Sequence, residues 1–400
     1  METFKNPFRP GAGQLPPYLS GRKDEQDEFR LMLDQSPVLK NLIITGLRGV
    51  GKTVLLETLK PLAVEKGWFW AGTDLSESAS VSEQSLAIRI LADLSGLVSS
   101  FTIGHEEQKT VGYIQNVQSK EIKLSYEILV KIYSESPGLD SDKLKVVLEF
   151  VWNAIKTKAK GVVLAYDEAQ ILQDKASDKQ FPLSVLLEVI QYLQRKGIPY
   201  FLILTGLPTL FPNLVEARTY AERMFHIMTL DKLTESESRE AILKPITQDS
   251  CPVSFSEEAI VSLMKFSGGY PYFIQFFCKE AFDSYLQQKA VGVETPAVTI
   301  NEVVRKLDSD FYSGRWSRIT ERQRDVLEII ATLPSANEEF SAHDILAKAT
   351  TSVAEKLSSS HLNQILKKLI ASGFIYKNKH GKYSFAVPML ADYINRQKKN

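Results

Sequence analysis

The sequence predicts an α/β fold: a parallel sheet flanked by helices in residues 41–232, then a helical region and a small C-terminal domain. Three observations lead to this prediction. Short apolar runs alternate with helical patterns in the first part of the chain, which is typical of a parallel sheet. A glycine-rich segment joins one apolar run to the helical pattern that follows it. The last region, residues 313–400, has three amphipathic helical patterns followed by two short strand-like runs.

The glycine-rich segment reads GLRGVGKT at residues 46–53, after the apolar run 42–44 and before a helical pattern that begins at Val54. It matches the P-loop pattern GxxxxGK[ST] in the strand, loop and helix setting that the pattern requires. The glycines let backbone amides point at phosphates, at the positive end of the next helix. The residues predicted to bind a nucleotide are Gly46, Arg48, Gly49, Val50, Gly51, Lys52, Thr53 and Val54. The alternative is a glycine-rich turn before an ordinary helix.

Lys52 is placed to reach the β and γ phosphates, and the Thr53 hydroxyl to bind Mg²⁺. The second part of such a site is expected at the end of a buried strand. The run 161–166 is such a strand, and Asp167 and Glu168 close it. Asp167 is therefore predicted to hold Mg²⁺, directly or through water. Glu168 is predicted to activate the attacking water as a general base.

A third apolar run, residues 200–204, follows the helical pattern 183–194 and ends at Thr205. Ligands of parallel sheets lie at the carboxyl ends of the strands. Thr205 is thus expected beside Glu168, where its hydroxyl could bind the γ phosphate or the attacking water. A helix N-cap or a turn residue is an equally good interpretation of Thr205.

Composition restricts the class of protein. The chain has 400 residues, 44% of them hydrophobic, which is enough for two or three cored domains. Its 48 basic and 48 acidic residues balance, so any basic surface that binds nucleic acid must be local. With two cysteines and no apolar run long enough to span a membrane, a soluble cytoplasmic protein with reduced thiols is expected. The histidines and cysteines do not have the spacing of a zinc site.

Five segments together resemble a known class of proteins: GLRGVGKT, VVLAYDEAQ and ILTGLP, the leader NPFRPGAGQLPPYLSGRKDEQDEF, and the later SGGYPYFIQ. Over most of its length the chain is similar to bacterial and archaeal ATP-binding proteins that border the replication-initiator clade of AAA+ ATPases and the STAND signalling NTPases. This resemblance implies ATP as the nucleotide. It also implies that an N-terminal arm and helix, residues 1–40, frame the adenine, with Arg22 packing near the ring.

Two features differ from the usual pattern of that class. Initiator-type ATPases would carry a sensor arginine where this chain has Gly269-Tyr270-Pro271, which resembles the glycine-x-proline motif of STAND-like proteins. A hinge or a nucleotide contact at Pro271 is implied, although an ordinary helix-starting turn has the same sequence. The 114 residues from Thr53 to Asp167 are about twice what two βα units need. An insertion is therefore expected near residues 96–140, as a candidate partner-binding subdomain.

The resemblance also implies an arginine that reaches the γ phosphate of a neighbouring subunit. Arg218 and Arg223 lie just before the strand-like run 226–230, and Arg223 is the better match. Such a residue would stabilise transition-state charge and make hydrolysis depend on a homo-oligomer. The alternative is a surface arginine that pairs with a carboxylate such as Glu222 or Glu216.

The remaining sequence predicts two further domains. Helical patterns at 235–243, 256–266 and 272–288 predict a lid that covers the nucleotide, residues 233–312. In residues 313–400, helical patterns at 320–333, 341–349 and 358–371 precede strands at 374–376 and 383–387. Three helices and a β hairpin make a winged helix.

The winged helix is a candidate for binding double-stranded DNA. The predicted outward face of its third helix carries Asn363, Gln364, Lys367 and Lys368, and the wing adds Lys377, Lys379 and Lys382. Asn and Gln can pair with adenine edges, and lysines can contact phosphate. Residues 315–400 hold 14 lysines and arginines against 8 aspartates and glutamates, a net charge of +6. Because winged helices also dock on proteins, a protein partner stays open.

The sequence thus predicts an AAA+-like ATPase in which Mg-ATP hydrolysis moves a winged helix that acts on DNA. The alternative is a STAND-like ATP-dependent switch or scaffold with little turnover, whose winged helix docks on a protein. These two functions differ in turnover and in the response to DNA. A small-molecule kinase is disfavoured, because no second acid or arginine cluster accompanies the P-loop.

Overall fold

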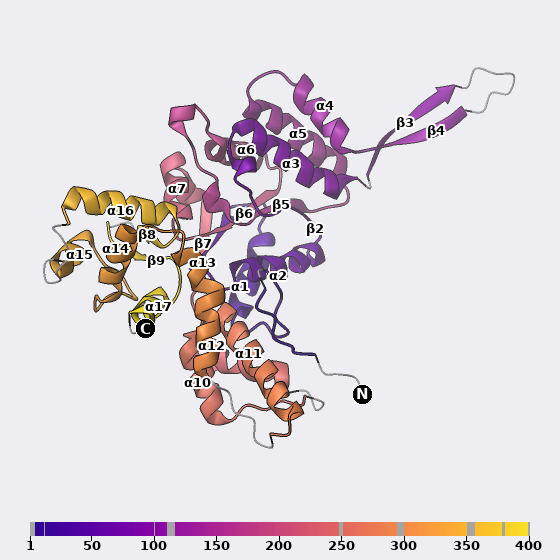
Figure 1. The fold of residues 1–400 in the computed structure, drawn as a ribbon. Coiled ribbons are helices and arrows are strands. Elements are labelled where there is room, and N and C mark those ends of the chain that lie inside the picture. The colour runs from indigo at the N-terminus through magenta and orange to yellow at the C-terminus, as the bar shows by residue number, and fades with distance from the viewer. Residues whose placement is uncertain are drawn as a thin grey trace.

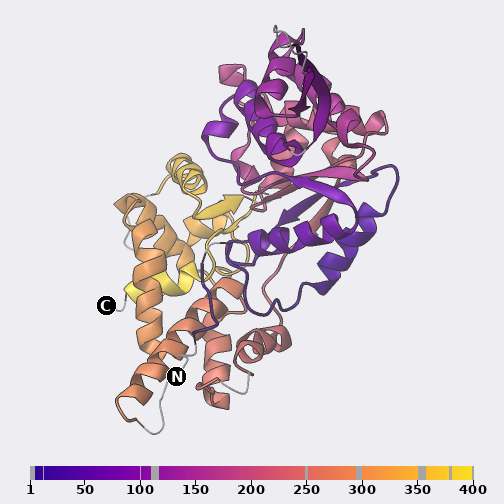
Figure 2. The same cartoon turned by 90° about the vertical axis from the view of Figure 1, so that its right-hand side faces the viewer.

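The centre of the molecule is a five-stranded parallel sheet in the order β2-β5-β6-β1-β7. The computed structural model describes residues 5–11, 13–99, 101–109, 117–247, 251–293, 300–349, 357–377 and 381–398, with the backbone alone at 102–109 and 117–122. The strands of the sheet are β1 (Asn41–Thr45), β2 (Trp68–Ala71), β5 (Gly161–Tyr166), β6 (Tyr200–Gly206) and β7 (Phe225–Thr229). The predicted α/β fold with a parallel sheet is confirmed. Figure 2 shows the sheet above the lid helices, with the winged helix beside them.

Helices cover both faces of this sheet. Successive residues of a strand point to opposite sides, so an apolar strand presents an apolar surface on each face. Leu42 and Ile44 belong to one apolar core, and Ile43 belongs to the other. The first core lies under α1 (Lys23–Leu33) and α2 (Lys52–Glu65). The second lies under α3 (Glu83–Val98), α4 (Tyr126–Glu135), α5 (Asp140–Ile155), α6 (Pro182–Arg195), α7 (Leu210–Ala217) and α8 (Ala221–Met224). Burial on both faces explains the unbroken apolar runs in the sequence.

An antiparallel hairpin leaves the sheet domain between α3 and α4. Its strands are β3 (Thr102–Lys109) and β4 (Val117–Lys123), and Figure 1 shows it projecting away from the rest of the molecule. The hairpin and α4 fall inside the stretch 96–140, where the sequence predicts an insertion. Since α4 packs against α3 and α5, only the hairpin stands apart from the domain.

In the described part of the lid region there are four α-helices: α9 (Glu235–Leu243), α10 (Glu257–Ser267), α11 (Pro271–Ala290) and α12 (Ile300–Leu307). A π-helical segment (Asp308–Ser313) and the short α13 (Gly314–Trp316) follow. The C-terminal elements are α14 (Glu321–Ala331), α15 (Ala342–Ala349), α16 (Ser359–Ala371), β8 (Ile375–Lys377), β9 (Tyr383–Phe385) and α17 (Leu390–Gln397). The predicted winged helix is confirmed, and α17 is an addition that packs on α14. No helix in the described ranges is both long and apolar enough to cross a membrane.

The lid and the winged helix share one hydrophobic core. The ring of Phe273 in α11 lies 5.2 Å from that of Phe311, and Tyr312 stacks on Tyr393 of α17 at 4.7 Å. The Tyr312 hydroxyl donates a hydrogen bond of 2.9 Å to the carbonyl oxygen of Pro388. In this structure the lid and the winged helix therefore form one packed unit.

Candidate nucleotide-binding site

A cavity of about 320 Å³ lies beside the P-loop, where the sheet domain, the N-terminal arm, the lid and α13 meet. Of the residues predicted from the sequence, Arg22, Arg48, Gly49, Val50, Gly51, Lys52, Thr53, Val54, Glu168 and Pro271 line it. Three further predicted residues are not in the lining but contact residues at the site. Gly46 accepts a hydrogen bond from Lys52, and Asp167 accepts hydrogen bonds from Thr53 and Thr205. The cavity is therefore built from segments that are far apart in the sequence.

The backbone of the P-loop is held from outside by donors to its carbonyl groups. The Arg22 guanidinium donates to the Val50 carbonyl at 3.0 Å, and the Tyr272 amide donates to the Gly49 carbonyl at 3.1 Å. Only glycine fits at position 46, because a Cβ there would lie 2.5 Å from the Leu230 carbonyl oxygen. The N-cap of α2 is a glycine without a side-chain cap, so no side chain competes for the first amides of that helix. These amides and the helix dipole favour an anion in the cavity.

Lys52 is half-buried and lines the cavity. Its Nζ donates to the carbonyl oxygens of Gly46 at 2.9 Å and Leu47 at 3.0 Å. Burial lowers the pKa of Lys52 from 10.5 to about 8; the charges of Glu168 and Asp167 oppose this change, and Arg48 adds to it. A phosphate next to Nζ would stabilise the charged form and raise this pKa again.

Asp167 is a buried carboxylate at the carboxyl end of β5, with only 3% of its surface exposed. It accepts hydrogen bonds from the Thr53 hydroxyl at 2.5 Å, from the Glu168 amide at 2.7 Å and from the Thr205 hydroxyl. The register of the sheet explains the last contact, because β5 and β6 pair Tyr166 with Leu204. Thr205 therefore contacts the Asp167 side chain, one residue before the Glu168 expected from the sequence.

Glu168 faces the cavity from a strained backbone position. Its φ of 52° lies in the left-handed region, which a residue other than glycine rarely adopts and which is concentrated at functional sites. The Gln170 amide donates to the Glu168 carboxylate, and the Gln170 oxygen accepts from the Leu207 amide at 3.1 Å. Gln170 thus fixes Glu168 relative to the end of β6. Sequence reasoning gave Gln170 no role, and its place in the Asp-Glu-Ala-Gln segment was the only available signal.

A third carboxyl group, which sequence reasoning also missed, lies near this pair. Asp74 follows β2, and its backbone forms an isolated parallel bridge with Asp167. Burial raises the pKa of Asp74, and the charges of Asp167 and Glu168 add to the increase. Asp74, after β2, and Asp167, after β5, therefore lie side by side at the carboxyl end of the sheet.

The N-terminal arm crosses from the lid to the sheet domain and forms one wall of the cavity. Asn6 donates to the Lys279 carbonyl at 3.0 Å and to Asp283 at 2.7 Å, and the Tyr18 hydroxyl donates to Glu240 at 2.8 Å. At the other end, buried Arg22 donates to the Val50 carbonyl and to the Asp231 carbonyl at 2.8 Å. The Arg22 side chain thus ties the P-loop to the chain beyond β7.

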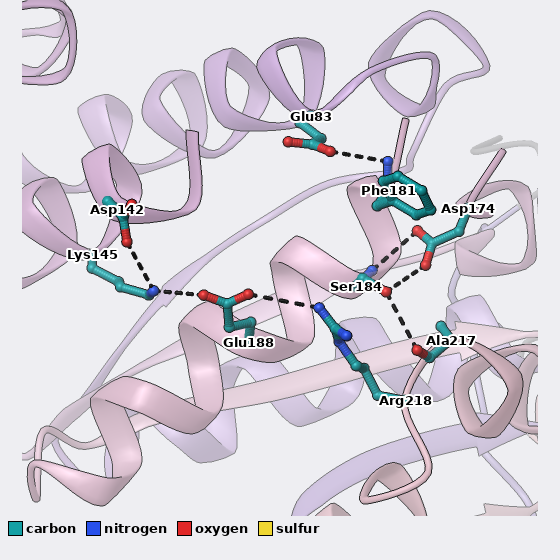
Figure 3. A network of polar contacts seen from close by, with 9 residues as sticks. All are labelled: Glu83, Asp142, Lys145, Asp174, Phe181, Ser184, Glu188, Ala217 and Arg218. Atoms are coloured by element: carbon teal, nitrogen blue, oxygen red, sulfur yellow. Dashed lines mark hydrogen bonds and ion pairs between the residues drawn. The ribbon is translucent and has the colours of Figure 1, made fainter. Parts of the chain in front are cut away.

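The two arginines considered for action on a neighbouring subunit differ in their surroundings. Arg218 lies 3.7 Å from Glu188, which also binds Lys145 at 2.6 Å, within the polar network of Figure 3. Arg223 is exposed on α8 and lines a separate hollow, away from the cavity of its own chain. Of the two, Arg223 is the one available to another molecule.

The outward face of α16 has the predicted composition. Asn363, Gln364, Lys367 and Lys368 are exposed, while Leu362, Ile365, Leu366 and Leu369 are buried. In the wing, Lys377 is exposed and Lys382 lies 3.7 Å from Glu339. Lys379 lies outside the described residues.

The sheet order, the P-loop and the helical lid define the class of fold: this is an AAA+-like P-loop ATPase fold with a winged helix. The chain is similar to the Walker-type ATPase of Pyrococcus abyssi, with 16% identity and a TM-score of 0.59 over 94% of this chain and 96% of that one. It is also similar to the ORC2 protein of Aeropyrum pernix in its ADP form, with 14% identity and a TM-score of 0.57 over 98% of this chain and 97% of that one.

A second structure of the Aeropyrum pernix ORC2 protein, of its ADPNP-ADP complexes, gives 14% identity and a TM-score of 0.54 over 98% of both chains. At such identities the likeness establishes the fold alone. Residues 309–394 match the family model described as "Domain of unknown function (DUF8462)". A search among curated proteins found no match.

The depressed pKa of Lys52 predicts proton uptake when ATP binds at alkaline pH. Below pH 8 the free protein already carries a charged Lys52, whereas above pH 8 the lysine must gain a proton to contact phosphate. We expect affinity to fall about tenfold per pH unit above this point. Calorimetry at pH 7 and pH 9, in two buffers of different ionisation enthalpy, measures the uptake. It should approach one proton at pH 9, and an uptake of zero at pH 9 would contradict the assignment.

Proposed function

We propose that the protein binds ATP with Mg²⁺ in this cavity and hydrolyses it, and that the nucleotide controls a winged helix that acts on double-stranded DNA. One observation carries this proposal: the buried Asp167 carboxylate accepts from both Thr53 and Thr205, directly behind the P-loop, while Glu168 faces the cavity. The named ligands of the Aeropyrum pernix ORC2 structures, ADP and ADPNP, support an adenine nucleotide.

The donor set at Asp167 fits Mg²⁺. A carboxylate and a hydroxyl oxygen lie in direct contact there, and Mg²⁺ prefers oxygen ligands completed by phosphate and water. We assign Thr53 and Asp167 as the residues that would hold the ion. Bound Mg²⁺ would neutralise phosphate charge during transfer.

The surrounding side chains supply the remaining roles. Lys52 leaves the Gly46 and Leu47 carbonyls and contacts the β and γ phosphates. Glu168, oriented by Gln170, accepts the proton of the attacking water. Thr205 holds the Asp167 carboxylate in place and lies near the γ phosphate. Arg223 reaches the γ phosphate of a neighbouring copy in a homo-oligomer, which its exposure and distance from its own cavity allow.

The DNA assignment rests on α16 and on local charge. Its exposed face presents two amides and two lysines, and residues 315–400 carry a net charge of +6 in a neutral chain. Because the winged helix is packed on the lid, a nucleotide that moves the lid would move this face as well.

Removing the proposed general base tests the ATPase assignment. Glu168→Gln keeps the size of the side chain but cannot accept a proton, so steady-state ATP hydrolysis should fall about 100-fold or more while ATP still binds. Glu65→Gln, on an exposed residue at the far end of α2, is the matched control and should keep full activity. Duplex DNA should stimulate the wild-type rate. Bound ATP with negligible turnover in every condition would instead favour the switch or scaffold with a protein partner.

Reversing charge on α16 tests the DNA surface. The double variant Lys367→Glu and Lys368→Glu should weaken duplex binding and reduce the slope of log affinity against log salt by about 2, since two phosphate contacts are lost. The double variant Lys60→Glu and Lys265→Glu changes the net charge equally at exposed sites outside the winged helix. If the two double variants have identical salt slopes, α16 does not contact DNA, and the winged helix is instead assigned to docking on a protein.

A further inference from the structure

An arginine from the start of the C-terminal region reaches the cavity beside the P-loop. Arg315 belongs to α13, which Figure 1 places where α12 meets the winged helix. Its side chain lines the same cavity as Lys52 and Glu168. Arg315 and Lys52 are 315 − 52 = 263 residues apart, so no local sequence pattern marks this placement.

The guanidinium of Arg315 has unused donor capacity at this position. Its Nη1 atom is buried and has no hydrogen-bond partner among the residues that the structure describes. The guanidinium carbon lies 4.9 Å from the centre of the Phe311 ring, which holds the group but accepts no ordinary hydrogen bond. A buried charged donor without an acceptor is rare in native proteins and calls for an explanation such as an absent ligand.

A second arginine stands close to the first. Arg48, inside the P-loop, also lines the cavity and donates to the Gly373 carbonyl of the winged helix at 3.0 Å. Burial lowers the pKa of Arg315, and the charge of Arg48 lowers it further. Five cationic side chains line this cavity, those of Arg9, Arg22, Arg48, Lys52 and Arg315, against one acidic lining residue, Glu168. This excess of positive charge favours a strongly anionic ligand.

We propose that Arg315 contacts the phosphates of the bound nucleotide, together with Arg48, so that the nucleotide bridges the sheet domain and the winged-helix region. This inference rests on the proposed function, because it requires ATP in this cavity. Phosphate oxygens supply the acceptor that Nη1 lacks and remove the repulsion between the two guanidinium groups. Phosphate binding by Arg315 then stabilises the packed position of the winged helix. Arg315 belongs to α13, which follows the lid helices in the chain.

Thermal unfolding with and without Mg-ATP separates this role from a structural one. Arg315→Ala removes an unpaired buried charge, so the melting temperature of the nucleotide-free protein should stay equal or rise. The increase produced by Mg-ATP should shrink, and ATP affinity measured by calorimetry should fall at least about tenfold, the effect expected for a charged hydrogen bond. Arg318→Ala, an exposed arginine three residues later, is the matched control and should change neither quantity.

Two outcomes would overturn the proposal. The first is an ATP affinity of Arg315→Ala equal to that of Arg318→Ala. The second is a lower melting temperature without nucleotide combined with an unchanged increase on adding Mg-ATP, which marks a purely structural residue. Lys52→Ala, measured in parallel, tests the proposed function separately. If wild type and Lys52→Ala bind ATP equally, or neither binds it, the nucleotide site itself is wrong.

Discussion

The conformation of the P-loop is the constraint on which the arrangement of the other parts depends. A loop whose amides converge on an anion turns carbonyl oxygens outward, and such oxygens need donors when they are buried. Here Tyr272 of the lid and Arg22 of the arm donate to the carbonyls of Gly49 and Val50. Arg48 of the loop in turn donates to Gly373 of the winged helix. The segment proposed to hold the phosphates is therefore attached directly to three other parts of the molecule.

These attachments are the contacts through which the proposed nucleotide would act on the winged helix. The Tyr272 amide, at the start of α11, donates to the Gly49 carbonyl of the P-loop, so a nucleotide that shifted the P-loop would act on α11 through this contact. The apolar contacts of Phe273 with Phe311, and of Tyr312 with Tyr393, continue that packing into the C-terminal region. In the proposed function, the lid and the winged helix would respond to the nucleotide as one unit, because both share one core. Rigid, packed elements transmit such displacements better than a flexible linker does.

Patterns within single segments predicted much of the fold. β5 begins and ends at the residues expected from the apolar run 161–166, and the lid and winged helix follow from helical periodicity. Three elements have weaker local sequence patterns and were not predicted: the four-residue edge strand β2, the hairpin and α17. At the site, the P-loop and the Asp-Glu pair carry their own motifs, whereas Gln170 and Arg315 reach it only through tertiary contacts. Thr205 was expected beside Glu168, and its hydroxyl donates to the adjacent Asp167; this partner depends on strand register, which is a property of the whole sheet.

The central claim is that one bound nucleotide acts on the arm, the P-loop, the lid and α13 at the same time. Hydrogen exchange with and without Mg-ATP, followed by mass spectrometry, tests this most directly. We predict joint protection of peptides covering residues 5–20, 46–54, 270–275 and 313–318, while the backbone of the β3-β4 hairpin exchanges at an unchanged rate. Protection confined to 46–54, or no protection in any of these peptides, would contradict the account.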